Sequence, residues 1–186
     1  MKVLIFEGIA TSGKSTVISE LEKTLVGLNT VVLGEDGTHL PIIQKISDKH
    51  IEFFESLISN IIDTRPEILM FDRLYLTQAF RAKCGLDDYV VIEEMLSYHS
   101  ACTFFFKVDE DKISQRISEA SKHRGANYFK SRGSTSEEIA KYYVDQQRSQ
   151  LELLKQSKLP YRVIDTTGNN YGKVVEQIVG TINQSN

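Results

Sequence analysis

A glycine-bounded segment between a short apolar run and a helical repeat constrains this chain more than any other feature of its sequence. Residues 3–6 are uninterrupted apolar types, which is typical of a strand buried on both faces of a parallel sheet. Gly8 ends the run, and apolar residues recur at helical spacing after Lys14. The sequence therefore predicts a strand, a tight loop and a helix. The apolar stripe of this helix consists of Ile18, Leu21, Leu25 and Leu28.

The same alternation of strand and helix continues to the end of the chain. Further short strands are expected at residues 31–33, 68–71, 103–106 and 161–165. Helical stretches separate them, the longest being expected over residues 136–157, and a last helix closes the chain. Strands that alternate with helices pair in parallel through right-handed crossovers. We therefore expect a single α/β domain over residues 1–186, with a doubly wound five-stranded parallel sheet and helices on both faces.

Charge and cysteine content exclude several classes of function. The 186 residues carry a formal net charge of −3, which argues against a general affinity for nucleic acid or for an anionic membrane. Cys84 and Cys102 have no further cysteine or histidine at metal-ligand spacing, so we expect plain thiols and a reducing compartment. No apolar run is long enough for a signal peptide or a membrane span. A cytoplasmic location is the simplest expectation.

The glycine-bounded segment satisfies the pattern G-x-x-x-x-G-K-[ST] and lies where that pattern acts, between a strand and a helix. Glycine lets the backbone wrap closely around phosphate oxygens, and the helix N-terminus adds partial positive charge. Lys14 is placed to reach the β- and γ-phosphates, and Ser15 to offer its hydroxyl to Mg²⁺. ATP and Mg²⁺ are the predicted cofactors. The predicted nucleotide-binding residues in this loop are Gly8, Thr11, Ser12, Gly13, Lys14, Ser15 and Thr16.

Two charged residues follow the third predicted strand. Asp72 has the position of a second Mg²⁺-organising carboxylate, and Arg73 is suited to holding another anionic group. A guanine-specifying Asn-Lys-x-Asp segment is absent, which argues against a switch GTPase. An ATP-driven motor usually has a catalytic carboxylate where Arg73 stands. The Asp-Arg pair thus favours a kinase with a separate phosphoryl acceptor.

A basic segment precedes the longest predicted helix. Residues 121–136 are polar, with two glycines, and we expect a loop that closes as a lid over the transferring phosphoryl group. Arg124 is a candidate catalytic cation in this lid, and Glu119 is the only carboxylate between Arg116 and Arg132. The cations of the region are Arg116, Lys122, Arg124, Lys130 and Arg132.

These pieces together resemble the thymidylate kinase family of P-loop kinases, with the deoxynucleoside kinases as close relatives. The resemblance covers nearly the whole chain and rests on residues 6–8, 13–16, 71–73 and 163–165 and on the basic lid. It implies ATP·Mg²⁺ as donor, with the loop after Asp165 near the adenine. It also implies that Arg73 holds the acceptor's phosphate and that Arg116 and Arg124 contact ATP. Homodimeric relatives suggest a homodimer.

The acceptor is the open question in the sequence. Departures from the family pattern include Ala10 in place of an acidic residue and Leu74 in place of a tyrosine. A nucleoside monophosphate needs cations such as Arg73, whereas a nucleoside needs a carboxylate base, for which Glu35 is the candidate. A nucleotide-binding regulatory module without turnover is the competing class. The four histidines, expected at the surface or half-buried, receive no role: His39, His50, His99 and His123.

Overall fold

All five predicted strands form one parallel sheet in the order β2-β3-β1-β4-β5, as expected. The computed structural model describes residues 1–39, 49–124 and 128–184. β1 lies at the centre, so both of its neighbours, β3 and β4, fix the positions of the segments that follow it. The strands are β1 (Lys2–Gly8), β2 (Thr30–Leu33), β3 (Ile68–Asp72), β4 (Ala101–Lys107) and β5 (Tyr161–Asp165).

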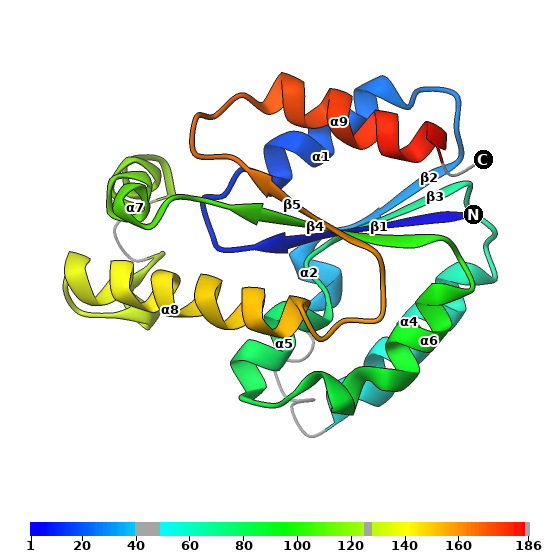
Figure 1. Cartoon of the computed structure of the whole chain (residues 1–186), viewed down its shortest axis with the longest axis horizontal. Coiled ribbons are helices and arrows are strands. Elements are labelled where there is room, and N and C mark those ends of the chain that lie inside the picture. Colours follow the sequence, from blue (N-terminus) through cyan, green and yellow to red (C-terminus); the bar gives the residue numbers. More distant parts are fainter. Residues whose placement is uncertain (40–48, 125–127, 185–186) are drawn as a thin grey trace.

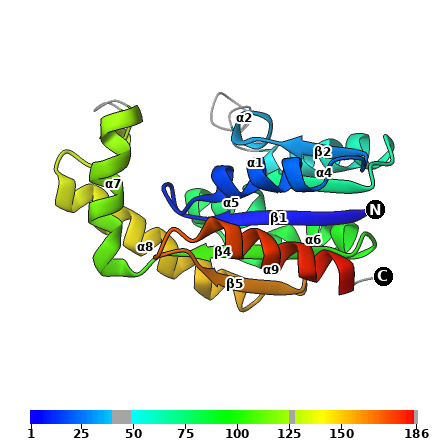
Figure 2. The same cartoon turned by 90° about the horizontal axis from the view of Figure 1, so that it is seen from above.

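Helices cover both faces of the sheet. In Figure 1 the helices α1 (Lys14–Thr24) and α9 (Tyr171–Gln184) lie on one face, and α4, α5, α6 and α8 lie on the other. The view in Figure 2 shows α7 standing beyond the carboxyl ends of the strands. The remaining bounds are α2 (Glu35–Thr38), α4 (His50–Ile62), α5 (Tyr75–Ala82), η2 (Leu86–Tyr89), α6 (Val90–Ser97), α7 (Glu110–Arg124), η3 (Lys130–Arg132) and α8 (Ser136–Leu154).

The apolar run of β1 divides between two cores. Successive side chains of a strand point to opposite faces of the sheet. Accordingly Val3 and Ile5 pack with the helices α4, α5, α6 and α8, while Leu4 and Phe6 pack with α1 and α9. All four side chains are buried. This two-sided burial explains why the run contains no polar residue.

The register of the central strands brings the sequence-predicted site together. β1 and β3 pair in parallel with Phe6 opposite Asp72, so both strands reach the same edge of the sheet. The loop after Gly8 and the pair Asp72 and Arg73 are therefore neighbours. A small third core fixes this edge against α7 and α8, and its buried members are Ile9, Ala10, Val108, Ile113, Ile117, Phe129 and Tyr143.

Three predicted boundaries were wrong. The first helix ends at Thr24 rather than near Leu28, because the chain turns at Gly27 with φ +98°, and Leu28 is 42% exposed. The helix expected over residues 136–157 ends at Leu154. The segment expected to be a loop from residue 121 begins as the last turn of α7, which carries basic residues that favour a helix C-terminus. It also contains η3, while residues 125–127 lie outside the described part of the chain.

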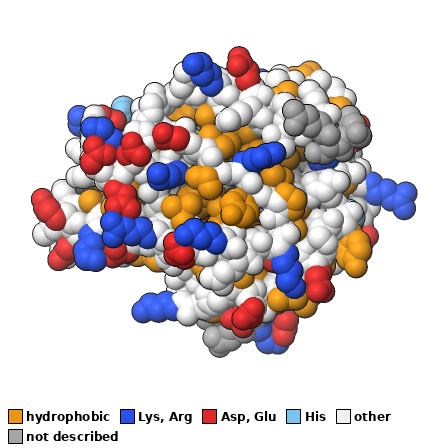
Figure 3. Space-filling view, in the orientation of Figure 1, with side chains coloured by type: hydrophobic (Ala, Val, Ile, Leu, Met, Phe, Trp, Pro, Cys, Tyr) orange, Lys and Arg blue, Asp and Glu red, His pale blue; other side chains and the backbone are white. Residues whose placement is uncertain are grey.

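The surface agrees with the modest net charge. On the face shown in Figure 3, basic and acidic side chains are interspersed rather than gathered by sign. None of the helices in the described part of the chain combines the length and the apolar character needed to cross a bilayer. Both cysteines are free thiols, as predicted.

Candidate active site

The loop between β1 and α1 requires glycine at both of its ends. Gly8 has φ +131°, and a Cβ there would lie 2.5 Å from the carbonyl oxygen of Phe106. Gly13 has φ +91°, and a Cβ there would lie 2.2 Å from the ring of Tyr171 on α9. Both values fall in the left-handed region that other residues rarely adopt. The two glycines of the motif are thus fixed by backbone shape and by close neighbours.

Lys14 lies buried at the centre of the loop. Its Nζ donates hydrogen bonds to the carbonyl oxygens of Gly8 and Ile9, at 3.0 and 2.8 Å, and to Ser12 Oγ at 3.2 Å. Burial, with the nearby charge of Arg73, lowers the pKa of Lys14 to about 7. The ammonium group is therefore only partly protonated at neutral pH, and an anion beside it would favour the protonated form.

We predict that Lys14 becomes protonated when a nucleotide binds. Without ligand the pKa is about 7, so near pH 8 most of the amine is neutral, whereas phosphate oxygens beside it raise the pKa. Binding at pH 8 should take up a proton, and binding at pH 6 should take up almost none. Titration calorimetry of ATP binding in two buffers of different ionisation enthalpy measures this uptake. Uptake that is unchanged in Lys14→Met would contradict the assignment.

Ser15 and Asp72 form a pair that suits a divalent cation. Ser15 Oγ donates a hydrogen bond to Asp72 Oδ2 at 3.0 Å. The second carboxylate oxygen, Asp72 Oδ1, is buried and has no hydrogen-bond partner in the described part of the chain. A buried carboxylate oxygen normally accepts a hydrogen bond, whereas an oxygen that binds a cation has no such partner when the cation is absent. A hydroxyl and a carboxylate are also oxygen ligands of the kind that Mg²⁺ prefers, so the pair fits this ion.

Arg73 lies beside Asp72 and joins the loop between β1 and α1 to Glu35. Its Nη1 donates to the carbonyl oxygen of Gly8 at 2.8 Å, and its Nε lies 3.4 Å from Glu35 Oε2. Arg81 on α5 donates to Glu35 Oε1 at 2.9 Å. Burial alone would raise the pKa of Glu35, but the two arginines outweigh it and hold the pKa at about 2. Glu35 is therefore ionised at neutral pH.

A fully buried carboxyl group that sequence reasoning did not single out supports Arg73. Glu7 accepts hydrogen bonds from the backbone N–H groups of Leu74, Leu76 and Thr77 and from Thr77 Oγ1. It thereby caps the first turn of α5 directly after Arg73, whose own φ is +72°. Burial raises the pKa of Glu7. The sequence signal was a charged residue inside an otherwise buried strand.

Arg116 ties three segments together rather than projecting freely into a cavity. Its guanidinium group donates to the carbonyl oxygens of Thr11, Thr166 and Thr167 and to Asn169 Oδ1. The side chain is buried, and it connects α7 with the phosphate loop and with the loop after β5. Arg116 thus holds the two loops at a fixed separation.

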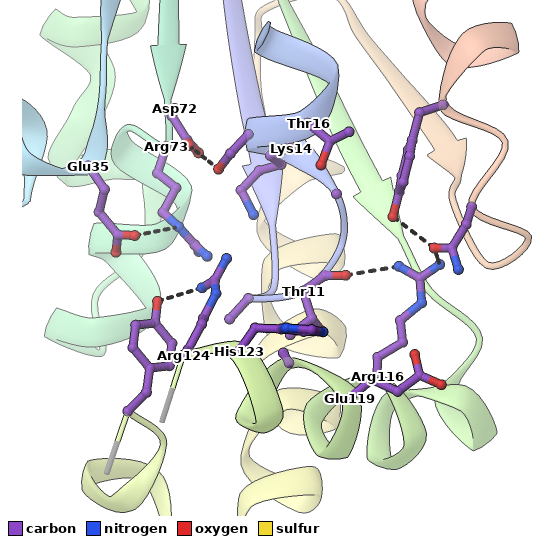
Figure 4. A pocket seen from close by; sticks show the side chains of 17 residues that line it. Thr11, Lys14, Thr16, Glu35, Asp72, Arg73, Arg116, Glu119, His123 and Arg124 are labelled. Carbon is purple, nitrogen blue, oxygen red and sulfur yellow. Dashed lines mark hydrogen bonds and ion pairs between the residues drawn. The ribbon is translucent and has the colours of Figure 1, made fainter. Parts of the chain in front are cut away.

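These residues surround a cavity of about 430 Å³ (Figure 4). Arg124 points into it from α7, opposite Lys14 and Arg73, and donates to the hydroxyl of Tyr128 at 2.8 Å. The predicted loop residues Gly8 and Ser12 and the predicted lid cations Lys122 and Lys130 are not among the residues that line it. The predicted site residues that line the cavity are Thr11, Gly13, Lys14, Ser15, Thr16, Glu35, Asp72, Arg73, Arg116 and Arg124.

A second cavity of about 270 Å³ adjoins the first. Glu35 and Arg73 line both, as do Ala10 and Tyr128. A further group of side chains lines the second cavity but not the first, and it includes two arginines and two tyrosines. That group consists of Asp36, Arg81, Arg132, Tyr142, Tyr143 and Gln146.

Solved structures resemble this architecture along almost its whole length. The YorR protein from Bacillus subtilis, in complex with phosphorylated GDP, matches with a TM-score of 0.72 at 19% identity, covering 98% of this chain and 96% of its own. Thymidylate kinase from Candida albicans matches with a TM-score of 0.63 at 18% identity, covering 98% of this chain and 91% of its own. Deoxyadenosine kinase from M. mycoides, with the products dCMP and dCDP bound, matches with a TM-score of 0.57 at 18% sequence identity. The match covers 99% of this chain and 100% of the kinase.

The fold is that of the P-loop nucleotide kinases. No family model matches the sequence, and no curated protein is similar enough to count as a relative. The expected resemblance to thymidylate kinase and to a deoxynucleoside kinase is confirmed at the level of three-dimensional structure. In this fold the first cavity lies against the loop between β1 and α1, which contributes Ala10, Thr11 and Gly13 to its lining.

Proposed function

We propose that this protein transfers a phosphoryl group from ATP to a nucleoside monophosphate in a Mg²⁺-dependent reaction. The observation that carries this proposal is the meeting of the two cavities at Arg73. Asp72 faces the phosphate loop through Ser15, whereas Arg73 reaches both cavities. A donor in the first cavity and an acceptor in the second would therefore meet beside one arginine.

Each residue would contribute by positioning and by charge. The amides of the loop and Lys14 would bind the donor phosphates, and Arg73 would orient the acceptor phosphate. Ser15 and Asp72 would hold Mg²⁺, which supplies charge neutralisation at the donor phosphates. Arg124, at the end of α7, would close over the transfer and help to exclude water. A monophosphate is already ionised at neutral pH, so it needs no protein base.

A second candidate, a nucleoside kinase, is favoured by the position of Glu35. This carboxylate lines both cavities and is ionised, so it could accept the proton of an attacking hydroxyl. Its pKa of about 2 makes it a weak base, because two arginines stabilise its charge. That weakness is our reason for ranking the monophosphate first.

Glu35→Gln separates the two acceptors. With a monophosphate acceptor, we expect kcat/KM to change by less than about tenfold, because the side chain only helps to hold Arg73 and Arg81. With a nucleoside acceptor, loss of a general base should lower kcat by about 10²- to 10⁴-fold. The measurement is an ATP-dependent screen of nucleosides and nucleoside monophosphates, read by mass spectrometry.

Glu22→Gln provides the matched control, since Glu22 is an exposed carboxylate of α1 that lines neither cavity. It should leave turnover nearly unchanged. Absence of ADP formation with every acceptor, together with normal ATP binding, would overturn the kinase proposal and support a regulatory nucleotide-binding module.

A further inference from the structure

Arg81, which lines the second cavity, and two residues near it have buried polar atoms without a hydrogen-bond partner in the described part of the chain. Within residues 1–39, 49–124 and 128–184, these atoms include both ring nitrogens of His39, Nη1 of Arg81 and Oε1 of Gln78. His39 is 0% exposed, which contradicts the expectation of a surface or half-buried histidine. Unpaired buried polar atoms destabilise a folded chain, so native proteins seldom keep them without a use.

These atoms belong to one region of the fold. His39 follows α2 directly, and its ring packs edge-on against Phe54, with ring centroids 6.2 Å apart. Gln78 and Arg81 are three residues apart on α5 and so share a helix face. Arg81 also lines the second cavity and holds Glu35. Arg81 thus places one unpaired atom at the second cavity, and His39 and Gln78, which line neither cavity, lie close to this arginine.

The unpaired donors and acceptors of His39, Arg81 and Gln78 restrict which ligand could bind to them. Burial and the charges of Arg81 and Arg73 lower the pKa of His39 to about 3, so its ring is neutral. A neutral imidazole presents one N–H donor and one acceptor nitrogen, and Arg81 adds a further donor. Gln78 Oε1 adds an acceptor. A ligand that satisfies them must carry donors and acceptors side by side, as the edge of a nucleobase does.

We propose that His39 and Arg81 bind the polar edge of the acceptor's nucleobase, an inference that rests on the proposed function. Their missing hydrogen bonds are supplied when the acceptor enters. His39 is accordingly a specificity-determining residue. Its buried, unpaired ring lowers the stability of the free protein, and the same unpaired atoms recognise the base when the acceptor binds.

The stability of a variant at residue 39 distinguishes a histidine that recognises a ligand from one that only supports the core. Replacing a histidine that holds the core through hydrogen bonds lowers stability, whereas replacing an unpaired one by an apolar ring of similar size is neutral or stabilising. His39→Phe should therefore raise the melting temperature of the free protein by about 2–4 °C. The same variant should weaken binding of the acceptor.

The test is titration calorimetry with each of the four deoxynucleoside 5′-monophosphates, and separately with ATP. For the best-bound monophosphate we expect His39→Phe to lower the affinity at least tenfold and to leave the affinity for ATP unchanged. His39→Gln, which keeps a donor and an acceptor, should recover part of the loss. His99→Phe, at a half-buried histidine that follows α6 and lines neither cavity, is the control and should change neither affinity.

The outcomes separate this inference from the proposed function. Unchanged monophosphate affinity in His39→Phe, or a lower melting temperature with equal loss of ATP binding, overturns the role of His39 while wild-type turnover stands. A wild-type protein that binds none of the monophosphates and phosphorylates none of them overturns the proposed function itself.

Discussion

Lys14→Ala is expected to lower the rate of phosphoryl transfer by about a thousandfold or more. Lys14 is the one buried ammonium group of the described loop, and its Nζ donates to the carbonyl oxygens of Gly8 and Ile9 inside the loop whose amide groups would bind the donor phosphates. Charge that develops on a transferring phosphoryl group depends on such preorganised cations, whose removal typically costs two or more powers of ten. The measurement is ADP and product formation under single-turnover conditions.

Two further variants make this result specific. Lys14→Met keeps the packing of the aliphatic stem, so it should show the same loss of rate with an unchanged melting temperature. Lys23→Ala removes an exposed lysine of the same helix, whose partner is Glu20, and should leave the rate unaltered. Retention of more than about a tenth of wild-type activity in Lys14→Met would count against the mechanism.

Arg73→Lys is expected to lower kcat/KM for a monophosphate acceptor by about a hundredfold. The guanidinium fork contacts the carbonyl oxygen of Gly8 and the carboxylate of Glu35 at once, and an ammonium group cannot reproduce both contacts together with a phosphate. Because the charge is kept, the KM for ATP should change little. Steady-state kinetics with each substrate varied in turn separate the two effects.

The control for this variant is Arg162→Lys, on the exposed edge strand β5. It should leave both KM values unchanged. An equal loss of affinity for ATP and for the acceptor in Arg73→Lys would instead place Arg73 in the donor site, and the order of the two cavities would have to be revised.

The sequence predicted the sheet and the phosphate loop because both depend on local patterns. Apolar runs identify the buried strands β1, β3 and β4, and the spacing of Gly8, Gly13 and Lys14 defines the loop on its own. Helix ends were predicted less well. α1 ends before Gly27, although apolar residues continue at helical spacing beyond it, so their pattern predicted too long a helix. The basic segment begins inside α7, because no glycine or proline precedes it in that helix.

Contacts between distant segments could not be predicted from a single sequence. Glu7 looked like an ordinary strand residue until the fold placed it under the first turn of α5. His39 has no motif around it, and only its position beside Arg81 and Phe54 shows that it is buried. Arg116 was predicted to contact ATP, but its bonds to Thr11 and Asn169 reveal how it joins two loops. Such relations arise from tertiary packing.

The ring of Tyr171 lies directly against Gly13, although the two residues stand near opposite ends of the chain. The loop that begins the fold is therefore completed by the last helix. During synthesis on the ribosome, the first strand and its loop emerge long before their cover exists. Nascent chains that end before α9 would lack the ring of Tyr171 against which Gly13 packs, so this loop reaches its final shape only after α9 has been synthesised.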